Sequence, residues 1–506
     1  MPKVAWRDLD AWDVIEHVKS GRLTVESAVQ AAIDSVHQVD SSLNFMVYEQ
    51  FDQVGERVAA APSGPLSGLP FLVKDIGSPV KGWPTSSGSR FLHQVPRPVE
   101  GELVRRLRAA GAIVIAKTNI PEFGLAPVTE SKLFGPCRNP WNSHHSPGGS
   151  SGGSGAAVAA GVVPIAHASD GGGSIRIPAS CCGLVGLKTS RGRLPMGPER
   201  SESWSGMAVE GFVTRTVRDS ALMLDVCAGP EFGAPYEIAH PEKAWVDVLK
   251  EPLQPLRIGV IAKGLLTDEL ASDECLNGLA ATQRTLESLG HEVVEHSVNI
   301  NVMAVQTAFI DALCGVVAGE IARAEDFVGR KATRRDYEAQ TWALKRVGET
   351  LSAGQQFYNV ATLQKAGREY LRQMFSEFDV VLTPTLNRPP VAVGELAPPW
   401  YQQWLMNVLN VLPKTGSLLH KLNMVKLQVA SPFEYVCNTP VFNISGAPAI
   451  SLPLHMDKGR ALPVGMHFGG PFGREDVLLQ LAAQLEGSDL WQPIDPAIKT
   501  DVMVEV

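Results

Sequence analysis

Two glycine-rich segments carry the serines that could take part in chemistry. The stretch SPGGSSGGSGAAVAAG covers residues 146–161, and SDGGGSIRIPAS begins at residue 169. Together they contain Ser150, Ser151, Ser154 and Ser174, with the first and last of these 24 positions apart. Glycine loses more conformational freedom on folding than any other residue. Such density therefore predicts a backbone that must come close to a phosphate, a substrate or another strand.

A phosphate-binding loop is the first interpretation, because backbone N–H groups at helix N-termini bind anions. The pattern G-x-x-x-x-G-K-[ST] is absent, since GLVGLKTS places Leu187 where a glycine should precede Lys188. No G-x-G-x-x-G follows a clear strand either. The sequence therefore does not favour phosphate binding.

A nucleophile elbow is the second interpretation, because GSSGG at residues 149–153 fits G-x-S-x-G with Ser151 as nucleophile. An elbow needs a strand directly before it. The preceding NPWNSHHSP is polar and holds two prolines, so it cannot be a central strand. A later histidine is also needed, and none has a context that singles it out among His240, His291, His296, His420, His455 and His467.

Serine catalysis with a lysine base is the third interpretation. A hydroxyl needs a base to become a nucleophile, and a lysine can serve if burial keeps it neutral. Lys74 ends the apolar run LPFLVK, but Lys117 and Lys188 satisfy the same chemical requirement. The DGGGS segment offers consecutive N–H groups for an oxyanion, and one such donor contributes roughly 3 kcal/mol to catalysis.

These segments resemble a known family. GGSSGGSGAAVAAG, followed by DGGGSIRIPAS and CGLVGLK, is similar to the core of the amidase signature family. LPFLVKD, AKTNIPEFG, RNPWN, FNISGAPAISLPL, PVGMHF and GREDVLLQLAAQLE resemble other family segments in family order, so the likeness extends over most of the chain. Within the family, the sequence looks most like bacterial hydrolases of the 6-aminohexanoate cyclic dimer type.

The resemblance implies a role for each residue at a matching position: the nucleophile Ser174, the relay Ser150, the base Lys74, and the oxyanion N–H donors Gly171, Gly172, Gly173 and Ser174. It also implies a non-proline cis peptide bond before the relay serine, which a glycine at 149 makes less crowded. It implies no metal and no cofactor. Without the resemblance, the two serines would be interpreted as turn residues and Lys74 as a strand-end surface lysine.

The implied activity is amide hydrolysis through an acyl-enzyme. The substrate is expected to be a bulky or partly apolar small-molecule amide, such as a cyclic or linear ω-amino-acid oligomer, an anilide or a carbamate. The alternatives are the amidase-like subunit of a tRNA-dependent amidotransferase and an inactive binding module. The amidotransferase group usually has Thr-Asp-Thr-Gly-Gly-Ser, whereas residues 169–174 are SDGGGS. Gly171 predicts a roomier acyl pocket. A homodimer is expected from family habit.

Neighbouring polar residues have structural interpretations. Asp170 and Arg176 could bind substrate, but we expect them to support the serine loop. Ser151 and Ser154 are expected to cap and pack the start of a helix. His144 and His145 are expected to be solvated in a loop, and Cys181 and Cys182 to be buried by packing. Substrate specificity is expected to be carried by loops near 125–145, 300–345 and 395–440.

Composition indicates an ordinary globular protein. The chain has 506 residues, 44% hydrophobic and 19% charged, with a net charge of −8, which gives no support for binding nucleic acid or anionic membranes. The seven cysteines form no C-x-x-C pair, so neither a zinc ribbon nor a disulfide framework is expected. With no signal-peptide core and no apolar run of about 18 residues recognised, a cytoplasmic location is expected.

Alternating helical and strand patterns predict an α/β fold, and the resemblance specifies an amidase signature fold. This fold has a large mixed central β-sheet flanked by helices, with a helical insertion. Four regions are predicted: 1–60 N-terminal and helical, 61–230 the signature core, 231–435 a partly helical insertion and substrate lid, and 436–506 strands and a helix completing the core. The Trp-, Leu- and Met-rich stretch 399–422 is interpreted as a lid, a partner surface or core.

Overall fold

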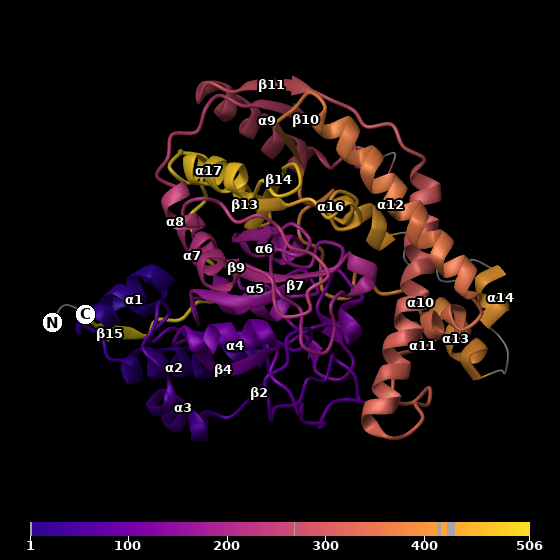
Figure 1. Ribbon diagram of the computed structural model, residues 1–506, viewed down its shortest axis with the longest axis horizontal. Helices are drawn as coiled ribbons and strands as arrows, with labels where there is room; N and C mark the ends of the chain where they lie inside the picture. Colours follow the sequence, from indigo (N-terminus) through magenta and orange to yellow (C-terminus); the bar gives the residue numbers. More distant parts are fainter. Residues whose placement is uncertain (1–2, 268, 412–415, 422–430) are drawn as a thin grey trace.

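A large mixed β-sheet runs through the computed structural model, which describes residues 3–267, 269–411, 416–421 and 431–506 (Figure 1). In spatial order its strands are β11 (Glu292–Glu295), β10 (Arg257–Val260), β12 (Val380–Pro384), β14 (Leu462–Gly469), β13 (Ala449–Asp457), β8 (Val185–Lys188), β9 (Val209–Thr214), β7 (Ile165–Asp170), β3 (Pro70–Lys74), β4 (Ile113–Thr118) and β2 (Met46–Glu49). This sheet confirms the predicted α/β fold.

Three neighbouring strands bring the candidate site residues to one edge of the sheet. β3 pairs in parallel with both β4 and β7. Nearly every side chain of these strands is buried, as expected for parallel strands covered on both faces. Parallel strands end at the same edge, so Lys74 at the end of β3 and Asp170 at the end of β7 lie close together. Open α/β sheets bind ligands at such edges.

Helices cover the sheet and extend beyond it (Figure 1). They are α1 (Ala11–Lys19), α2 (Val25–Leu43), α3 (Val54–Ala60), α4 (Glu102–Ala109), α5 (Gly152–Ala159), α6 (Arg176–Cys182), α7 (Val217–Cys227), α8 (Trp245–Val248), α9 (Asp273–Ser288), α10 (Val302–Val328), α11 (Ala339–Gly348), α12 (Ala353–Phe375), α13 (Trp400–Val411), α14 (Gly416–Lys421), α16 (Pro440–Ser445) and α17 (Glu475–Glu486).

The segments on either side of the signature core join the same sheet. β10, β11 and β12 come from the predicted insertion, and the C-terminal strands β13 and β14 lie between β12 and β8, as the sequence indicates. β2 lies at the far edge of the sheet, within a region predicted to be helical. Short terminal strands, β1 (Lys3–Ala5) and β15 (Met503–Glu505), pair antiparallel, so the two chain ends are neighbours.

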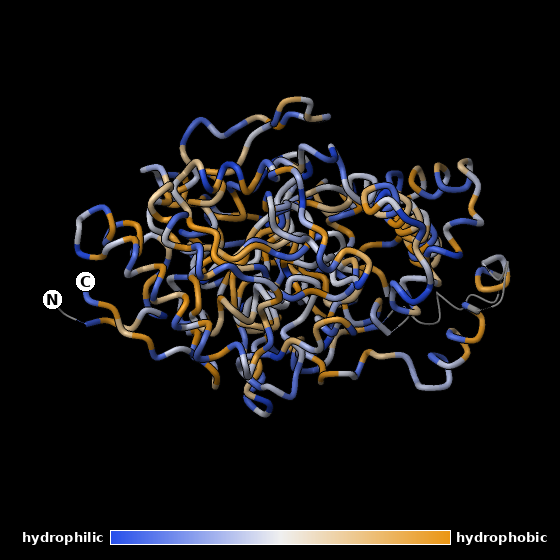
Figure 2. Tube along the Cα trace, turned by 90° about the horizontal axis from the view of Figure 1, so that it is seen from below, coloured by the Kyte–Doolittle hydropathy of each residue, from blue (hydrophilic) through white to orange (hydrophobic). Residues whose placement is uncertain are grey.

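Two hydrophobic clusters stabilise the molecule, one around the sheet and one among α10, α11, α12 and α16. In Figure 2, hydrophobic segments of the backbone trace run through the middle of the molecule. By length and composition alone, α10 could cross a membrane, a stretch that the sequence analysis did not recognise. Its most apolar window is 39% buried, and the helix packs against α11 and α12.

The stretch 399–422 is not simply core. α13 and α14 pack against α11, and Met406 is almost fully buried. The other face of α13 leaves Trp400 and Trp404 largely exposed to solvent. Within the described part of this stretch, no residue lines the cavity that holds the candidate site. Residues 412–415 and 422 lie outside the described residues.

Candidate active site

A cavity of about 140 Å³ lies at the edge where β3 and β7 end. Its wall comes from the loop after β3 (76–97), from Phe123 and Gly124, from the two serine loops, from residues 196–210 and from the last turns of α10. Ser150, Ser169 and Ser174 all line it. Both predicted catalytic serines, Ser150 and Ser174, therefore lie in the wall of the same cavity.

The lysine that ends β3 points at the relay serine. Lys74 is fully buried, and its Nζ lies 2.8 Å from Ser150 Oγ. The same nitrogen lies 3.0 Å from Ser169 Oγ and 3.2 Å from the Ser169 carbonyl oxygen. The peptide bond between Gly149 and Ser150 is cis, as the resemblance implies. Ser169 is a partner of the lysine that the sequence analysis did not identify.

The surroundings of Lys74 favour its neutral form. Burial lowers the pKa of Lys74 from its ordinary value of 10.5 to about 7, against the opposing effect of the Glu210 and Asp170 carboxylates. A neutral amine has two N–H bonds and one lone pair. Lys74 Nζ lies within hydrogen-bonding distance of all three oxygens, so a neutral amine could donate its two N–H bonds to Ser169 and accept the Ser150 hydroxyl proton on its lone pair. Lys74 can thus act as a base near neutral pH.

Two other buried lysines have different partners. Lys117 Nζ lies 3.0 Å from a carboxylate oxygen of Asp75 and donates to Thr85 Oγ1 at 2.7 Å. Lys188 donates to the carbonyl oxygens of Thr189 and Ala447, each at 2.8 Å. Burial lowers the pKa of both lysines. Neither contacts a serine of the two loops, so the geometry favours Lys74 among the three candidates left open by residue chemistry.

The loop between β7 and α6 presents Ser174 and several amides. Gly173 N–H donates to Asp170 Oδ1 at 2.6 Å, so it is not available to the cavity. Among the described residues, no acceptor pairs with the amides of Gly171, Gly172 and Ser174. Likewise, within this part of the chain no hydrogen bond joins Ser174 to Ser150. The predicted oxyanion site therefore keeps three of its four candidate donors.

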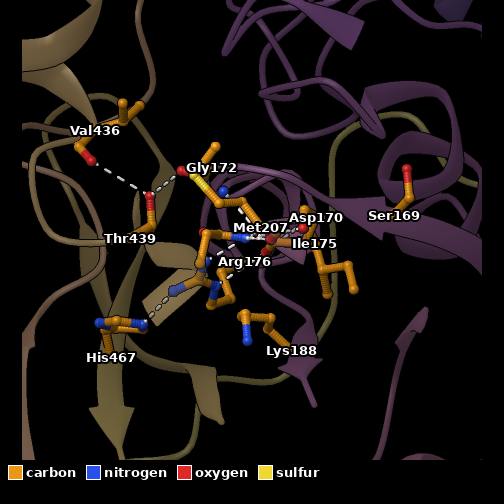
Figure 3. A network of polar contacts seen from close by, with 12 residues as sticks. Ser169, Asp170, Gly172, Ile175, Arg176, Lys188, Met207, Val436, Thr439 and His467 are labelled. Carbon is orange, nitrogen blue, oxygen red and sulfur yellow. Dashed lines mark hydrogen bonds and ion pairs between the residues drawn. The ribbon is translucent and has the colours of Figure 1, made fainter. Parts of the chain in front are cut away.

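Gly173 has a different role in this loop. Its φ of +132° is one that L side chains rarely adopt, and an added Cβ would lie 2.2 Å from Thr439 Oγ1. Thr439 donates to the Gly172 carbonyl at 2.7 Å, which holds the loop on this side (Figure 3). The third glycine thus allows the chain to turn between the strand and the nucleophile.

A buried polar network holds the loop from below (Figure 3). Arg176 binds the Asp170 carboxylate through two nitrogens, each at 2.9 Å, and also contacts Asn443 and His467. Burial opposes ionisation of Asp170, but the Arg176 charge and the hydrogen bonds outweigh it and hold the pKa of Asp170 well below its ordinary value. The expectation that Asp170 and Arg176 support the loop is confirmed, and neither lines the cavity in the part described.

The prediction that Gly171 makes the acyl pocket roomier is wrong. A Cβ added at Gly171 would lie 2.8 Å from Cε3 of Trp204, so the indole occupies the space that a side chain at 171 would need. Trp204 also lines the cavity. It has a φ of +52° and begins a tight turn, Trp204–Gly206. The glycine makes room for an aromatic wall rather than for a larger substrate.

A second buried pair lies beside Lys74. His167 Nε2 donates to Glu210 Oε2 at 2.6 Å, and the Lys74 backbone N–H donates to His167 Nδ1 at 3.2 Å. This arrangement fixes the neutral tautomer with its proton on Nε2. Glu210 lines the cavity. This pair could not be predicted, because nothing in the local sequence links positions 167 and 210.

Ser151 and Ser154 pack rather than cap. Ser151 exchanges long hydrogen bonds with the Ser169 backbone, and no side-chain cap is formed at the start of α5. Ser154 Oγ donates to the His167 carbonyl at 2.7 Å. No strand lies directly before Ser151, since the nearest preceding strand in the described chain is β6 (Gly135–Pro136), and this excludes the nucleophile elbow. The packing prediction is confirmed, and the capping prediction is wrong.

The remaining site expectations are partly confirmed. His144 is exposed and His145 half-buried in a loop, and all seven cysteines are buried with no disulfide bond between them. Of the three predicted specificity segments, only 300–345 contributes to the described cavity wall, through α10. The segments 76–97 and 196–210 were missed. Across the described residues, no three His, Cys, Asp or Glu side chains gather where they could hold a metal ion.

Comparisons with known proteins show the family. A family model described as Amidase matches residues 25–418. The 6-aminohexanoate-cyclic-dimer hydrolase of Paenarthrobacter ureafaciens is 33% identical over 500 residues, covering 96% of this chain and 95% of the relative. The putative amidase AmiC of Mycobacterium tuberculosis (strain H37Rv) is 36% identical over 502 residues, covering 96% of each. The solved structure of a 6-aminohexanoate cyclic dimer hydrolase complexed with substrate has a TM-score of 0.85 at 31% identity, covering 97% of this chain and 98% of that chain.

Proposed function

The chain belongs to the amidase family, and we propose that it cleaves amides through a Ser174–Ser150–Lys74 triad and an acyl-enzyme intermediate. It is a hydrolase of carbon–nitrogen bonds other than peptide bonds. The observation that carries the proposal is the 2.8 Å contact between Lys74 Nζ and Ser150 Oγ inside the cavity that Ser174 lines.

Acylation begins when Ser174 attacks the amide carbonyl carbon. Its proton passes to Ser150, whose own proton passes to the lone pair of Lys74. The C–O bond forms as the carbonyl π electrons move onto oxygen. The amides of Gly171, Gly172 and Ser174 then stabilise the oxyanion, because they have no other described acceptor. When the C–N bond breaks, the proton returns through Ser150 to the leaving amine.

Deacylation follows the same route in reverse. A water molecule attacks the ester of Ser174 and gives its proton to the Ser150–Lys74 pair. The tetrahedral intermediate collapses, and Ser174 leaves with a proton and releases a carboxylic acid. No step requires a cofactor. The lysine must be neutral to accept the first proton, which agrees with the lowering of its pKa by burial to about 7.

The substrate proposed is a bulky or partly apolar amide. Ile76, Leu92 and Phe123 line the cavity together with Trp204 and Phe327, which suits an apolar chain or ring. Cyclic and linear ω-amino-acid oligomers, anilides and carbamates all fit this description. The similarity to a protein named 6-aminohexanoate-cyclic-dimer hydrolase gives cyclic ω-amino-acid dimers the first place among them.

The test is amine release by the purified chain alone. The panel contains simple amides, anilides and the cyclic dimer of 6-aminohexanoate, each incubated with the wild type and with Ser174→Ala. Release by the wild type only supports the proposal. Release by both proteins assigns the nucleophile elsewhere. Release by neither, followed by activity once a partner subunit and tRNA are added, would instead favour an amidotransferase subunit.

A further inference from the structure

An arginine that forms no ion pair with any described residue lines the cavity. Arg97 lies in the loop after β3, and hydrogen bonds fix its backbone on both sides: its N–H donates to Trp83 O at 2.9 Å, and its carbonyl accepts from Gly82 N at 2.8 Å. Its guanidinium carbon lies 4.6 Å from the ring centroid of Phe327 on α10. Backbone and side chain are therefore both held before any ligand arrives.

The guanidinium of Arg97 has N–H groups that donate to no described residue. Its Nε is shielded from solvent and has no hydrogen-bond acceptor among the described residues. No carboxylate in that part of the chain forms an ion pair with it. A charged donor that is removed from water without an acceptor is costly, and a ligand that supplies one is favoured. An anionic group of a ligand would therefore be bound favourably at this part of the cavity wall.

Two of the neighbouring carboxylates have other partners, and a third, Glu199, also lines the cavity. Glu320 holds Arg200 through two contacts of 3.1 Å, and Asp75 is paired with Lys117. Glu199 also acts on Arg97 electrostatically, but it is exposed, so solvent screens its charge. Arg323, at the exposed rim, donates to the Glu199 backbone carbonyl at 3.2 Å. Among the described residues of this wall, Arg97 is therefore the half-buried cation whose guanidinium can bind a negatively charged ligand.

We propose that Arg97 binds a carboxylate carried by the amide substrate at a distance from the scissile bond. A planar guanidinium offers paired N–H donors that match the two oxygens of a carboxylate, and stacking on Phe327 sets its plane. The aromatic and aliphatic side chains of the cavity wall contact the part of the substrate that joins the carboxylate to the amide. The inference rests on the proposed amidase function and adds that, among its substrates, amides with a remote carboxylate, such as linear ω-amino-acid oligomers, are cleaved faster than matched amides without one.

The test compares matched substrates that differ only in the remote carboxylate. One pair places it on the acyl side: the mono-anilide of adipic acid against hexanoyl anilide. The other places it on the amine side: N-hexanoyl-6-aminohexanoate against N-hexyl hexanamide. kcat/KM is measured for the wild type, Arg97→Gln, Arg97→Lys and the exposed surface control Arg105→Gln, each checked for an unchanged Tm.

The wild type is expected to prefer the carboxylate member of at least one pair by about tenfold to a hundredfold. Arg97→Gln should lose this preference, measured as the ratio of kcat/KM between the two members of a pair. Arg97→Lys should keep part of the preference, and the control all of it. Equal rates on both members of both pairs in the wild type would overturn the inference, as would a preference that survives in Arg97→Gln.

A binding measurement separates this inference from the proposed function. Titration calorimetry of Ser174→Ala with the same four compounds needs no turnover. Tighter binding of a carboxylate member, lost in the Ser174→Ala/Arg97→Gln double variant, supports the Arg97 site even if the wild type hydrolyses none of them. Hydrolysis of the neutral members without any carboxylate advantage in binding would leave the amidase proposal standing and overturn the Arg97 site.

Discussion

Lys74 Nζ lies 2.8 Å from Ser150 Oγ in a fully buried position, and this contact links the end of a parallel strand to the loop before α5. The pair lies 76 positions apart in the sequence and meets only because β3 and the glycine-rich loop converge on the same sheet edge. The catalytic account depends on the lysine being neutral there.

The first prediction concerns the pH dependence of catalysis. Because burial lowers the pKa of Lys74 to about 7, the lysine is protonated below that pH and free to accept a proton above it. kcat/KM for an anilide should therefore rise as the pH passes through about 7 and then level off. A pH–rate profile that is flat from pH 5 to 9 would contradict the assignment.

The second prediction concerns the lysine itself. Lys74→Ala removes the base and should lower kcat by about 10²–10⁴-fold. The matched controls are Lys117→Ala and Lys188→Ala, whose lysines contact no serine of the two loops. Single-turnover rates of the fraction that remains folded separate chemistry from stability. If a control variant loses as much catalysis per folded molecule as Lys74→Ala, the choice among the three lysines is wrong.

The third prediction concerns Glu210 as a positioning residue. Its carboxylate raises the pKa of Lys74 against the effect of burial. Glu210→Gln can still accept the His167 Nε2 proton but carries no charge, so the acidic limb of the pH–rate profile should move to lower pH. Asp247→Asn, at an exposed position on α8, should leave the limb unchanged. A shift to higher pH in Glu210→Gln would refute this role.

The fourth prediction concerns Gly171 and Trp204. Because the indole occupies the space beside the glycine, Gly171→Ala must displace the ring, and such overpacking costs about 1–3 kcal/mol. The variant should lose stability and kcat/KM, and Gly171→Ala/Trp204→Ala should regain part of the stability. Urea denaturation of the wild type, Gly171→Ala, Trp204→Ala and the double variant measures the coupling. Additive losses in the double variant would show that the two residues do not interact.

The fifth prediction concerns the network beneath the loop. Asp170→Asn leaves Arg176 buried without its countercharge, which should cost about 3–5 kcal/mol in the free energy of unfolding. The folded-state pKa of Asp170 lies below its unfolded value of about 3.9, so its contribution is present above that pH and is lost as the pH falls through the folded value. Unfolding curves at pH 7 and pH 3 should therefore differ less for Asp170→Asn than for the wild type. An equal difference would contradict this role.

Much of the site could be predicted because its signals are local. The two glycine-rich loops single out four serines, among which the family resemblance selects Ser150 and Ser174, and the apolar run before Lys74 indicates a buried strand. Composition could not choose among three lysines that are all buried. The contact with a serine distinguishes them, and the sequence reached the same residue only through the family resemblance.

The parts that escaped prediction depend on distant segments or on local polar detail. Trp204 and Arg97 reach the cavity from separate loops, and no spacing in the sequence relates them to Ser174. Gly173 was expected to donate to an oxyanion, but the Asp170 side chain folds back onto its amide. β2 was missed because Met46–Glu49 is a short, half-buried edge strand within a helical region.

Mapping the acyl-enzyme tests the central claim most directly. The wild type is mixed with an anilide, quenched with acid within a single turnover, digested and analysed by mass spectrometry. The account predicts the mass of the acyl group on the peptide that contains Ser174, and no adduct in Ser174→Ala. An adduct on another residue, or undiminished amine release by Ser174→Ala, would contradict it.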